Sequence, residues 1–254
     1  MNKKGLTERD ICSKFINPAL KSSGWDLRTQ IREEVTFTDG RVIVQGSLHS
    51  RGKAKRADYI LYYKANMPIA IIEAKDNKHN VGDGMQQALE YSEILDIPFV
   101  FTSNGDSFVF HDKTIQDGPI EREISLEQFP TPDELREKYN TYKNLDNPEL
   151  IEIAEQDYFS DDSGMSPRYY QQIAVNRTVE AVAKGIDRIL LVMATGTGKT
   201  YTAFNIIWRL WKSKKKQRIL FLADRSALLT QTKNGDFSPF GNDIMHIIKN
   251  RKID

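Results

Sequence analysis

The segment Pro68-Ile69-Ala70-Ile71-Ile72-Glu73-Ala74-Lys75 sets the architecture of the first half of this chain. Its apolar run has no polar face, which is typical of a central strand buried on both sides. The run ends abruptly in Glu73 and Lys75, and alternation places these side chains on one face, about 6.6 Å apart along the strand. Charged groups at the end of a buried strand are costly unless they are paired or bound to a metal. The segment therefore predicts a site as well as a strand.

Asp58 opens the preceding predicted strand, which continues to Tyr63. At that position its carboxylate is expected to lie beside Glu73. Two carboxylates form a hard, oxygen-rich site suited to Mg²⁺, which would orient a phosphate and lower the pKa of a water nucleophile. Lys75 would offset the charge that develops on the phosphate. A strand end with a simple salt bridge explains the same three residues, so the pattern alone leaves both interpretations open.

The surrounding pattern predicts strands and helices on both sides of this segment. Thr7 is a suitable N-cap for a helix over about 8–22, although Pro18 makes its last turn doubtful. The pair Asp39-Gly40 indicates a hairpin turn, and Asn104-Gly105 indicates another. The predicted strands cover residues 28–32, 34–38, 41–44, 99–102 and 108–110, and a helix covers about 83–95.

A second sequence motif begins at Thr195, 120 residues after Lys75. An apolar strand over 189–193 enters a loop of small residues, a helix is expected over 199–212, and a second buried strand over 219–223. This strand–loop–helix–strand order is the context that a phosphate-binding loop requires. The loop consists of Thr195, Gly196, Thr197, Gly198, Lys199 and Thr200.

The residue types in this loop indicate that it binds the phosphates of a nucleoside triphosphate. Gly196 and Gly198 let backbone N–H groups approach phosphates at the start of a helix. Lys199 would contact the β- and γ-phosphates, and the Thr200 hydroxyl would bind Mg²⁺. Met193 stands where the common pattern has its first glycine, which is a departure from it.

Composition is typical of soluble globular protein. The chain has 254 residues, 39% hydrophobic and 28% charged, enough for two modest domains. No apolar run approaches the ~20 residues that span a bilayer, and the N-terminus does not resemble a signal peptide. Cys12 is the only cysteine, which excludes disulfides within the chain and favours a reducing cytoplasm.

Charge divides the chain into three parts. Residues 131–165 hold 10 acidic and 3 basic residues, whereas residues 166–254 hold 16 basic and 6 acidic residues. We therefore expect a first domain over 1–130, an acidic linker over 131–165 and a second domain over 166–254. The basic last third is suited to polyphosphate or nucleic acid.

The first domain resembles the PD-(D/E)xK nucleases, through Asp58, Glu73 and Lys75. Gln87 and Tyr91 lie four residues apart on one helical face and resemble the Q-x-x-x-Y element of one branch of that superfamily. The resemblance implies a mixed sheet flanked by helices, and supporting DNA or active-site contacts for these two residues. The same resemblance brings a first-helix acid, here Glu8, towards the site, although a capping role for Glu8 is the simpler interpretation.

The second domain resembles the first RecA-like lobe of superfamily 2 helicases. Gln171, in Pro167-Arg-Tyr-Tyr-Gln171, matches the adenine-reading motif, and Leu220–Arg225 matches a motif that touches nucleic acid. No acidic Walker B box follows Lys199, so the lobe is incomplete. We expect that this chain alone does not hydrolyse ATP efficiently.

Together the two domains resemble the motor and endonuclease subunit of type I restriction enzymes. The resemblance implies ATP-dependent translocation and Mg²⁺-dependent cleavage of double-stranded DNA, with methyltransferase and specificity subunits as partners. Two alternatives stay open: another nuclease–helicase such as a type III subunit, and a non-catalytic DNA-binding or assembly module.

Overall fold

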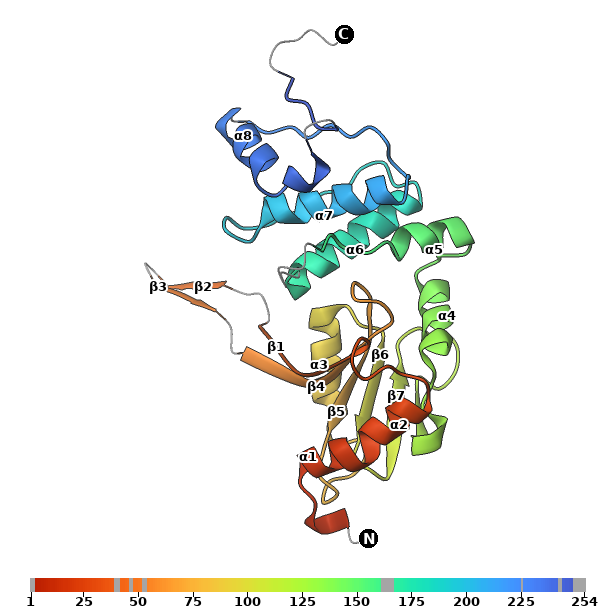
Figure 1. Ribbon diagram of the computed structural model, residues 1–254. Helices are drawn as coiled ribbons and strands as arrows, with labels where there is room; N and C mark the ends of the chain where they lie inside the picture. The colour runs from red at the N-terminus through yellow and green to blue at the C-terminus, as the bar shows by residue number, and fades with distance from the viewer. Residues whose placement is uncertain are drawn as a thin grey trace. The chain divides into compact units, whose positions relative to one another are not determined.

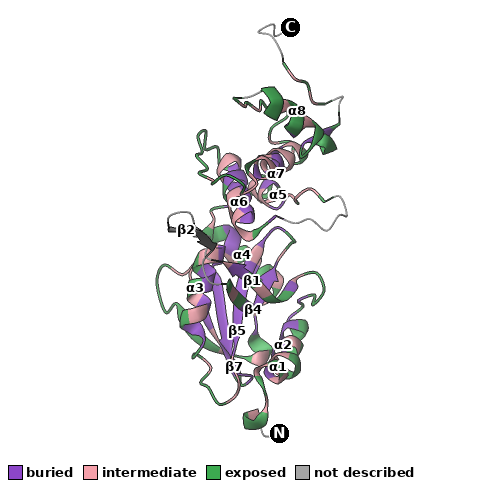
Figure 2. Cartoon of the chain, turned by 90° about the vertical axis from the view of Figure 1, so that its left-hand side faces the viewer, coloured by how far each residue is buried: buried purple, intermediate pink, exposed green. Residues whose placement is uncertain are grey.

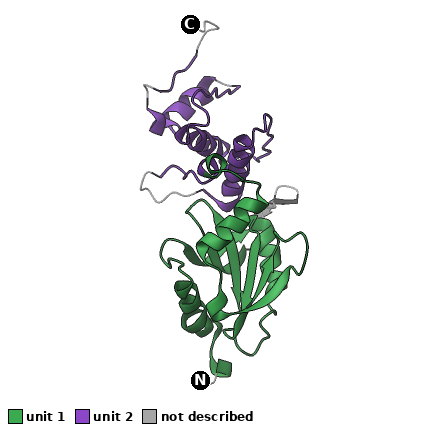
Figure 3. Ribbon diagram, turned by 90° about the vertical axis from the view of Figure 1, so that its right-hand side faces the viewer, with its two compact units in different colours: residues 1–151 green, residues 152–254 purple. Residues whose placement is uncertain are grey.

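A computed structural model describes residues 3–38, 42–45, 48–51, 54–160, 167–224, 226–241 and 244–248 (Figure 1). These residues form two compact units, 1–151 and 152–254 (Figure 3). The division lies within the acidic segment 131–165. None of the described helices is both long and apolar enough to cross a membrane.

The first unit is built on a six-stranded mixed sheet with the order β1-β4-β5-β6-β7-β8. Only β5 and β6 pair in parallel, and α3 makes the crossover between them. The strands are β1 (Ile31–Thr38), β4 (Ala54–Tyr62), β5 (Pro68–Ala74), β6 (Phe99–Ser103), β7 (Ser107–Asp112) and β8 (Glu121–Ser125). β2 (Val42–Gln45) and β3 (Leu48–Arg51) form a separate two-stranded sheet.

The predicted central strand is confirmed. Every residue of β5 after Pro68 is buried, because β5 has a hydrogen-bonded neighbour on each edge and helices on both faces. The neighbour of β1 is β4, and the predicted turn at Asp39-Gly40 lies outside the described residues. Strand β8, which closes the sheet beyond β7, was absent from the sequence prediction, because its residues are mostly exposed and carry little apolar pattern.

Helices cover the two faces of this sheet (Figure 2). One face carries the first helical segment, which runs through α1 (Glu8–Ile11), η2 (Cys12–Ile16) and α2 (Asn17–Ser22), together with α4 (Pro132–Tyr142). The other face carries α3 (Met85–Leu95). The short helices η1 (Lys3–Gly5) and η3 (Leu126–Gln128) complete this unit, and α5 (Pro148–Ala154) spans the division between the units.

The first helix continues through its doubtful last turn. Pro18 has no backbone N–H and its ring crowds the preceding turn, which normally breaks a helix. Here the turn before Pro18 widens into a π-helix, in which the Asn17 N–H donates to the Cys12 carbonyl five residues back. The widened turn accommodates the proline, so Ala19 and Leu20 reach the buried core.

The second unit is helical in its described residues. It contains α6 (Tyr169–Ala183), α7 (Lys199–Lys212), α8 (Ser226–Asn234) and η4 (Ser238–Phe240). Phe204, Phe237 and Phe240 form its aromatic core, with Trp208 and Phe159 packed against them.

The strands predicted over 189–193 and 219–223 are not formed, and this prediction was wrong for the structure. Both segments lack regular secondary structure, and Leu190, Val192 and Leu222 are largely exposed. A strand requires a neighbour to pair its backbone groups, and neither segment pairs with the other. The burial predicted for the two apolar runs is therefore also wrong for this structure.

Candidate active site

The site lies at the end of β5, on the sheet face covered by α3. Ala70, Ile72 and Ala74 belong to the core under α1, α2 and α4, so alternation turns Ile71 and Glu73 towards α3. Tyr59 of β4 pairs with Ile72 in the antiparallel register. Continuing this register by one residue places Asp58 opposite Glu73.

The structure brings the two carboxylates together. Asp58 Oδ2 accepts a hydrogen bond of 2.8 Å from the Ala74 amide, which ties Asp58 to the end of β5. Burial raises the pKa of Asp58, although the Ala74 amide acts in the opposite direction. Burial, and then the negative charge of Asp58, raises the pKa of Glu73 to about 7. The charge of Asp58 therefore makes Glu73 harder to ionise, as expected when two acids lie close together without a cation.

Glu73 is held by two donors on one of its oxygens. The Lys75 ammonium donates to Glu73 Oε1 over 2.9 Å, and the Gln87 side chain of α3 donates to the same oxygen. Partial burial lowers the pKa of Lys75, but its hydrogen bond to Glu73 and the nearby carboxylates outweigh that effect and raise it. Lys75 is therefore an ammonium group beside the carboxylates.

The second oxygen of Glu73 has no hydrogen-bond partner among the described residues, although Glu73 is only 2% exposed. A buried, unpaired carboxylate oxygen costs free energy unless something binds it. Mg²⁺ is commonly held by one or two carboxylates, with water and phosphate oxygens as its other ligands. The described residues contain no group of three or more His, Cys, Asp or Glu side chains that could hold a metal. The pair Asp58 and Glu73 thus fits Mg²⁺ and does not fit a metal that requires an all-protein cage.

Gln87 and Tyr91 lie on the predicted helical face. Gln87 Nε2 is 3.1 Å from the Tyr91 hydroxyl, so the tyrosine contacts the amide that in turn contacts Glu73. The Tyr91 ring packs edge-on against Phe37 of β1, and the Lys55 ammonium lies 5.8 Å from its centre. The five residues selected from the sequence therefore form one connected cluster.

Glu8 lies in the first turn of α1, and the charges of this cluster act on its pKa. The capping box is formed by Thr7 and Asp10. Burial raises the pKa of Glu8, and the charge of Asp58 adds to that rise while Lys75 opposes it. The expected position of Glu8 as an acid in the first turn of its helix is confirmed, and Asp10 of the same turn makes the capping hydrogen bonds.

Sequence reasoning missed Gly84, the N-cap residue of α3. A β-carbon built there would stand 2.9 Å from Glu73 Cγ and 3.3 Å from Lys75 Cε. Only glycine permits this close approach. Two glycines in Gly82-Asp83-Gly84 just before a helix were the available signal.

In the second unit, the loop before α7 takes a conformation that requires glycine. Gly196 and Gly198 both have φ of +80°, and Gly198 is the N-cap of α7. The Lys199 ammonium donates to the Ala194 carbonyl over 3.1 Å, and the Thr197 hydroxyl donates to the same oxygen over 2.7 Å. The lysine is therefore turned back onto its own loop. Thr195 is exposed, and Thr200 is half-buried in the first turn of α7.

Gln171 reaches this loop from the start of α6. Its Nε2 donates to the Thr197 carbonyl over 2.9 Å, and its Oε1 accepts from the Arg168 amide over 2.8 Å. The structure thus brings the predicted adenine reader and the phosphate-binding loop together, through a contact with the loop backbone.

Comparison with known proteins finds relatives that match both units. Residues 28–125 match the family model described as the type I restriction enzyme R protein N terminus, and residues 164–254 match the type III restriction enzyme res subunit. The chain is 55% identical, over its whole length, to the type I restriction enzyme EcoAI endonuclease subunit of Escherichia coli, of which it covers 31%. This chain belongs to the type I restriction enzyme endonuclease subunits.

Two further relatives support this membership. The type I restriction enzyme EcoKI endonuclease subunit of Escherichia coli K12 is 31% identical to this chain. The matched region covers 68% of this chain and 18% of the EcoKI subunit. A solved fragment described as an HsdR subunit from Vibrio vulnificus YJ016 has a TM-score of 0.75 and 42% identity, covering 93% of this chain and 43% of that one. The chain spans less than a third of the curated relatives it matches.

Proposed function

We propose that residues 1–130 carry the Mg²⁺-dependent endonuclease of a type I restriction enzyme and that the P-loop unit belongs to its ATP-dependent DNA translocase. The observation that supports cleavage most directly is the buried Glu73 Oε2, which has no hydrogen-bond partner among the described residues, on a strand whose register places Glu73 opposite Asp58. Asp58 and Glu73 would hold the ion, which supplies an activated water and orients the scissile phosphate when bound.

The other side chains of the cluster have distinct tasks. Gln87 fixes the orientation of the Glu73 carboxylate, and Tyr91 fixes Gln87. Lys75 lies where its ammonium can offset charge that develops on the phosphate. Glu73 lies in β5, Lys75 directly follows β5, and Gln87 and Tyr91 lie in α3. These side chains can therefore act without a movement of the sheet.

In the second unit, we assign ATP to the loop of Thr195 to Thr200. Lys199 would exchange its carbonyl partners for the β- and γ-phosphates, and Thr200 would contact the bound Mg²⁺. Gln171 would contact adenine from its position beside Thr197. The double-stranded DNA substrate, the methyltransferase and specificity partners and a cytoplasmic location are part of the same proposal, by analogy with the relatives.

The test compares single substitutions in the assembled enzyme. Asp58→Ala and Lys75→Ala should abolish Mg²⁺-dependent DNA cleavage while DNA binding and ATPase activity persist. A non-catalytic assembly module predicts that both variants behave as the wild type. Cleavage by both variants would overturn the site assignment.

A further inference from the structure

The loop of residues 76–83 has both of its ends in the candidate active site. It begins directly after Lys75 and ends at Gly84, which packs against Glu73 and Lys75. The loop therefore determines where α3 starts, and α3 carries the Gln87 amide that contacts Glu73. A displacement of the loop by even a fraction of an ångström would move two contacts of Glu73 together.

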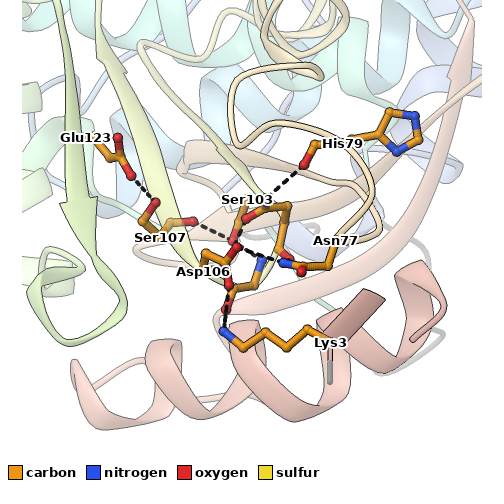
Figure 4. A network of polar contacts seen from close by, with 9 residues as sticks. Lys3, Asn77, His79, Ser103, Asp106, Ser107 and Glu123 are labelled. Atoms are coloured by element: carbon orange, nitrogen blue, oxygen red, sulfur yellow. Dashed lines mark hydrogen bonds and ion pairs between the residues drawn. The ribbon is translucent and has the colours of Figure 1, made fainter. Parts of the chain in front are cut away.

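Two asparagine side chains bind this loop to the β6–β7 turn, in opposite directions (Figure 4). From the loop, Asn77 Nδ2 donates to the Asn104 carbonyl over 3.0 Å and to Asp106 Oδ2 over 2.9 Å. From the turn, Asn104 Nδ2 donates to the His79 carbonyl over 2.9 Å. Asn104 is buried and its bond to His79 is partly buried, whereas the bond from Asn77 to Asp106 is exposed to water.

The turn that receives these bonds is itself anchored. The Lys3 ammonium donates to Asp106 Oδ1 over 2.8 Å, as Figure 4 shows, and to the Gly105 carbonyl over 2.7 Å. The hydrogen bonds from Lys3 and Asn77 lower the pKa of Asp106, so Asp106 is a carboxylate and its bonds are charge-assisted. Ser103 Oγ donates to the Ser107 carbonyl over 2.8 Å inside the turn.

The same turn also holds the strand end that carries the site. The Lys75 amide donates to the Ser103 carbonyl over 2.9 Å, which extends the β5–β6 pairing past Ala74. Residues 75, 77 and 79 are thus attached in succession to the segment 103–106. These hydrogen bonds therefore fix the start of the 76–83 loop, which continues to Gly84.

We propose that Asn77 and Asn104 are positioning residues for the cleavage reaction, because they hold the 76–83 loop so that Gly84 and Gln87 keep Glu73 in a metal-binding orientation. This inference rests on the proposed function. Neither asparagine has a recorded hydrogen bond to the Asp58 or Glu73 carboxylate, so both act through the loop. Partners that orient metal ligands typically contribute 10–100-fold to metal affinity or activity.

The test uses two neutral substitutions. Asn77→Ala removes both donors to the turn. Asn104→Ser keeps a side-chain oxygen that can accept from the Asp106 amide, as Asn104 does now, but it is too short to reach the His79 carbonyl. Lys78→Ala, an exposed change in the same loop, is the matched control.

Mg²⁺ binding to the chain is measured by titration calorimetry, and DNA cleavage by the assembled enzyme is measured against Mg²⁺ concentration. Both asparagine variants should raise the dissociation constant and the half-saturating Mg²⁺ concentration about tenfold, and excess Mg²⁺ should restore most of the cleavage rate. Lys78→Ala should leave the dissociation constant unchanged. A merely structural role would reduce the folded fraction, seen in thermal unfolding, without changing the dissociation constant of the folded molecules.

Wild-type Mg²⁺ affinity in both asparagine variants would overturn the inference. Asp58→Ala, measured in parallel, separates this failure from that of the proposed function. If Asp58→Ala abolishes Mg²⁺ binding while the asparagine variants bind normally, only the positioning role fails. If Asp58→Ala binds Mg²⁺ and cuts DNA like the wild type, the proposed function itself fails.

Discussion

Asp58 on β4 and Ala74 on β5 are joined by a side-chain-to-backbone hydrogen bond of 2.8 Å at the point where their strand pairing ends. The bond uses one oxygen of the Asp58 carboxylate as a structural acceptor. The same group also carries the charge that raises the pKa of Glu73. Substitution can separate these two tasks.

Asp58→Asn should keep the fold and remove the metal site. The amide oxygen can still accept from Ala74, so we expect the free energy of unfolding to change by less than about 1 kcal/mol. Without the second carboxylate, Mg²⁺ binding and DNA cleavage should be lost. Thermal unfolding and cleavage assays check this, with Asp117→Asn, an exposed loop carboxylate, as the control.

Gly84→Ala should displace Glu73 by steric overlap, without changing any charge in the site. Its added methyl group would stand 2.9 Å from Glu73 Cγ, and Glu73 is too buried to move aside freely. Overpacking of this kind costs about 1–3 kcal/mol, and we expect reduced stability together with weaker Mg²⁺ binding. Gly82→Ala is the matched control, because its β-carbon would meet only Val109 Cγ2, at 4.0 Å. Equal effects of both substitutions on Mg²⁺ binding would contradict the prediction.

Stability of the metal-free protein should fall as pH rises from about 4.5 to about 7. The pKa of Glu73 is raised from 4.5 to about 7 on folding, so the folded state binds this proton more tightly than the unfolded state. The favourable contribution of the protonated group is present at low pH and is lost as the group ionises, by an amount on the order of 3 kcal/mol. Urea unfolding at pH 5 and pH 8 measures the change.

Glu73→Gln provides the comparison for that experiment, since it removes the titrating group and keeps the size of the side chain. The variant should show a smaller loss of stability between the two pH values. Mg²⁺ should stabilise the wild type more at pH 8 than at pH 5, because the ion binds the ionised carboxylates. The same pH dependence in Glu73→Gln and wild type would assign the effect to another group.

Lys199→Ala should weaken ATP binding while leaving the fold of the second unit intact. The Lys199 side chain is exposed and contacts only loop carbonyls among its recorded hydrogen bonds, so its removal disturbs no core. The loss of a charge-assisted contact to phosphate corresponds to at least about a tenfold drop in affinity. Titration of a fluorescent ATP analogue measures this, and Lys216→Ala, an exposed basic residue on the same unit, should bind as the wild type.

Much of the first unit could be predicted from the sequence, because its signals are local. The uninterrupted apolar run of β5 requires burial on both faces, and the Asn104-Gly105 turn requires a hairpin. The proximity of Asp58 and Glu73 followed from placing them at the ends of neighbouring strands. What could not be predicted depends on long-range packing: the Gly84 contact, the orientation of Glu8 and the Asn77–Asp106 bond join residues that no local pattern connects.

The structure of the second unit could be predicted only in part from the sequence. The loop and α7 follow from glycine conformation and helix start signals, which are local. The two apolar runs before and after α7 predict strands only on the condition that neighbouring strands pair with them, and this condition is not met among the described residues 167–224, 226–241 and 244–248. Roles for Thr195 to Thr200 and for Gln171 stay predictions until nucleotide binding is measured.

The central claim is that Asp58 and Glu73 share one divalent cation. Crystals of the chain soaked in Mn²⁺, which substitutes for Mg²⁺ and scatters anomalously, test it most directly. The account predicts one anomalous peak within about 2 Å of an oxygen of each carboxylate, lost in Asp58→Asn. A peak bound to other residues, or no peak beside Glu73 at saturating Mn²⁺, would contradict it.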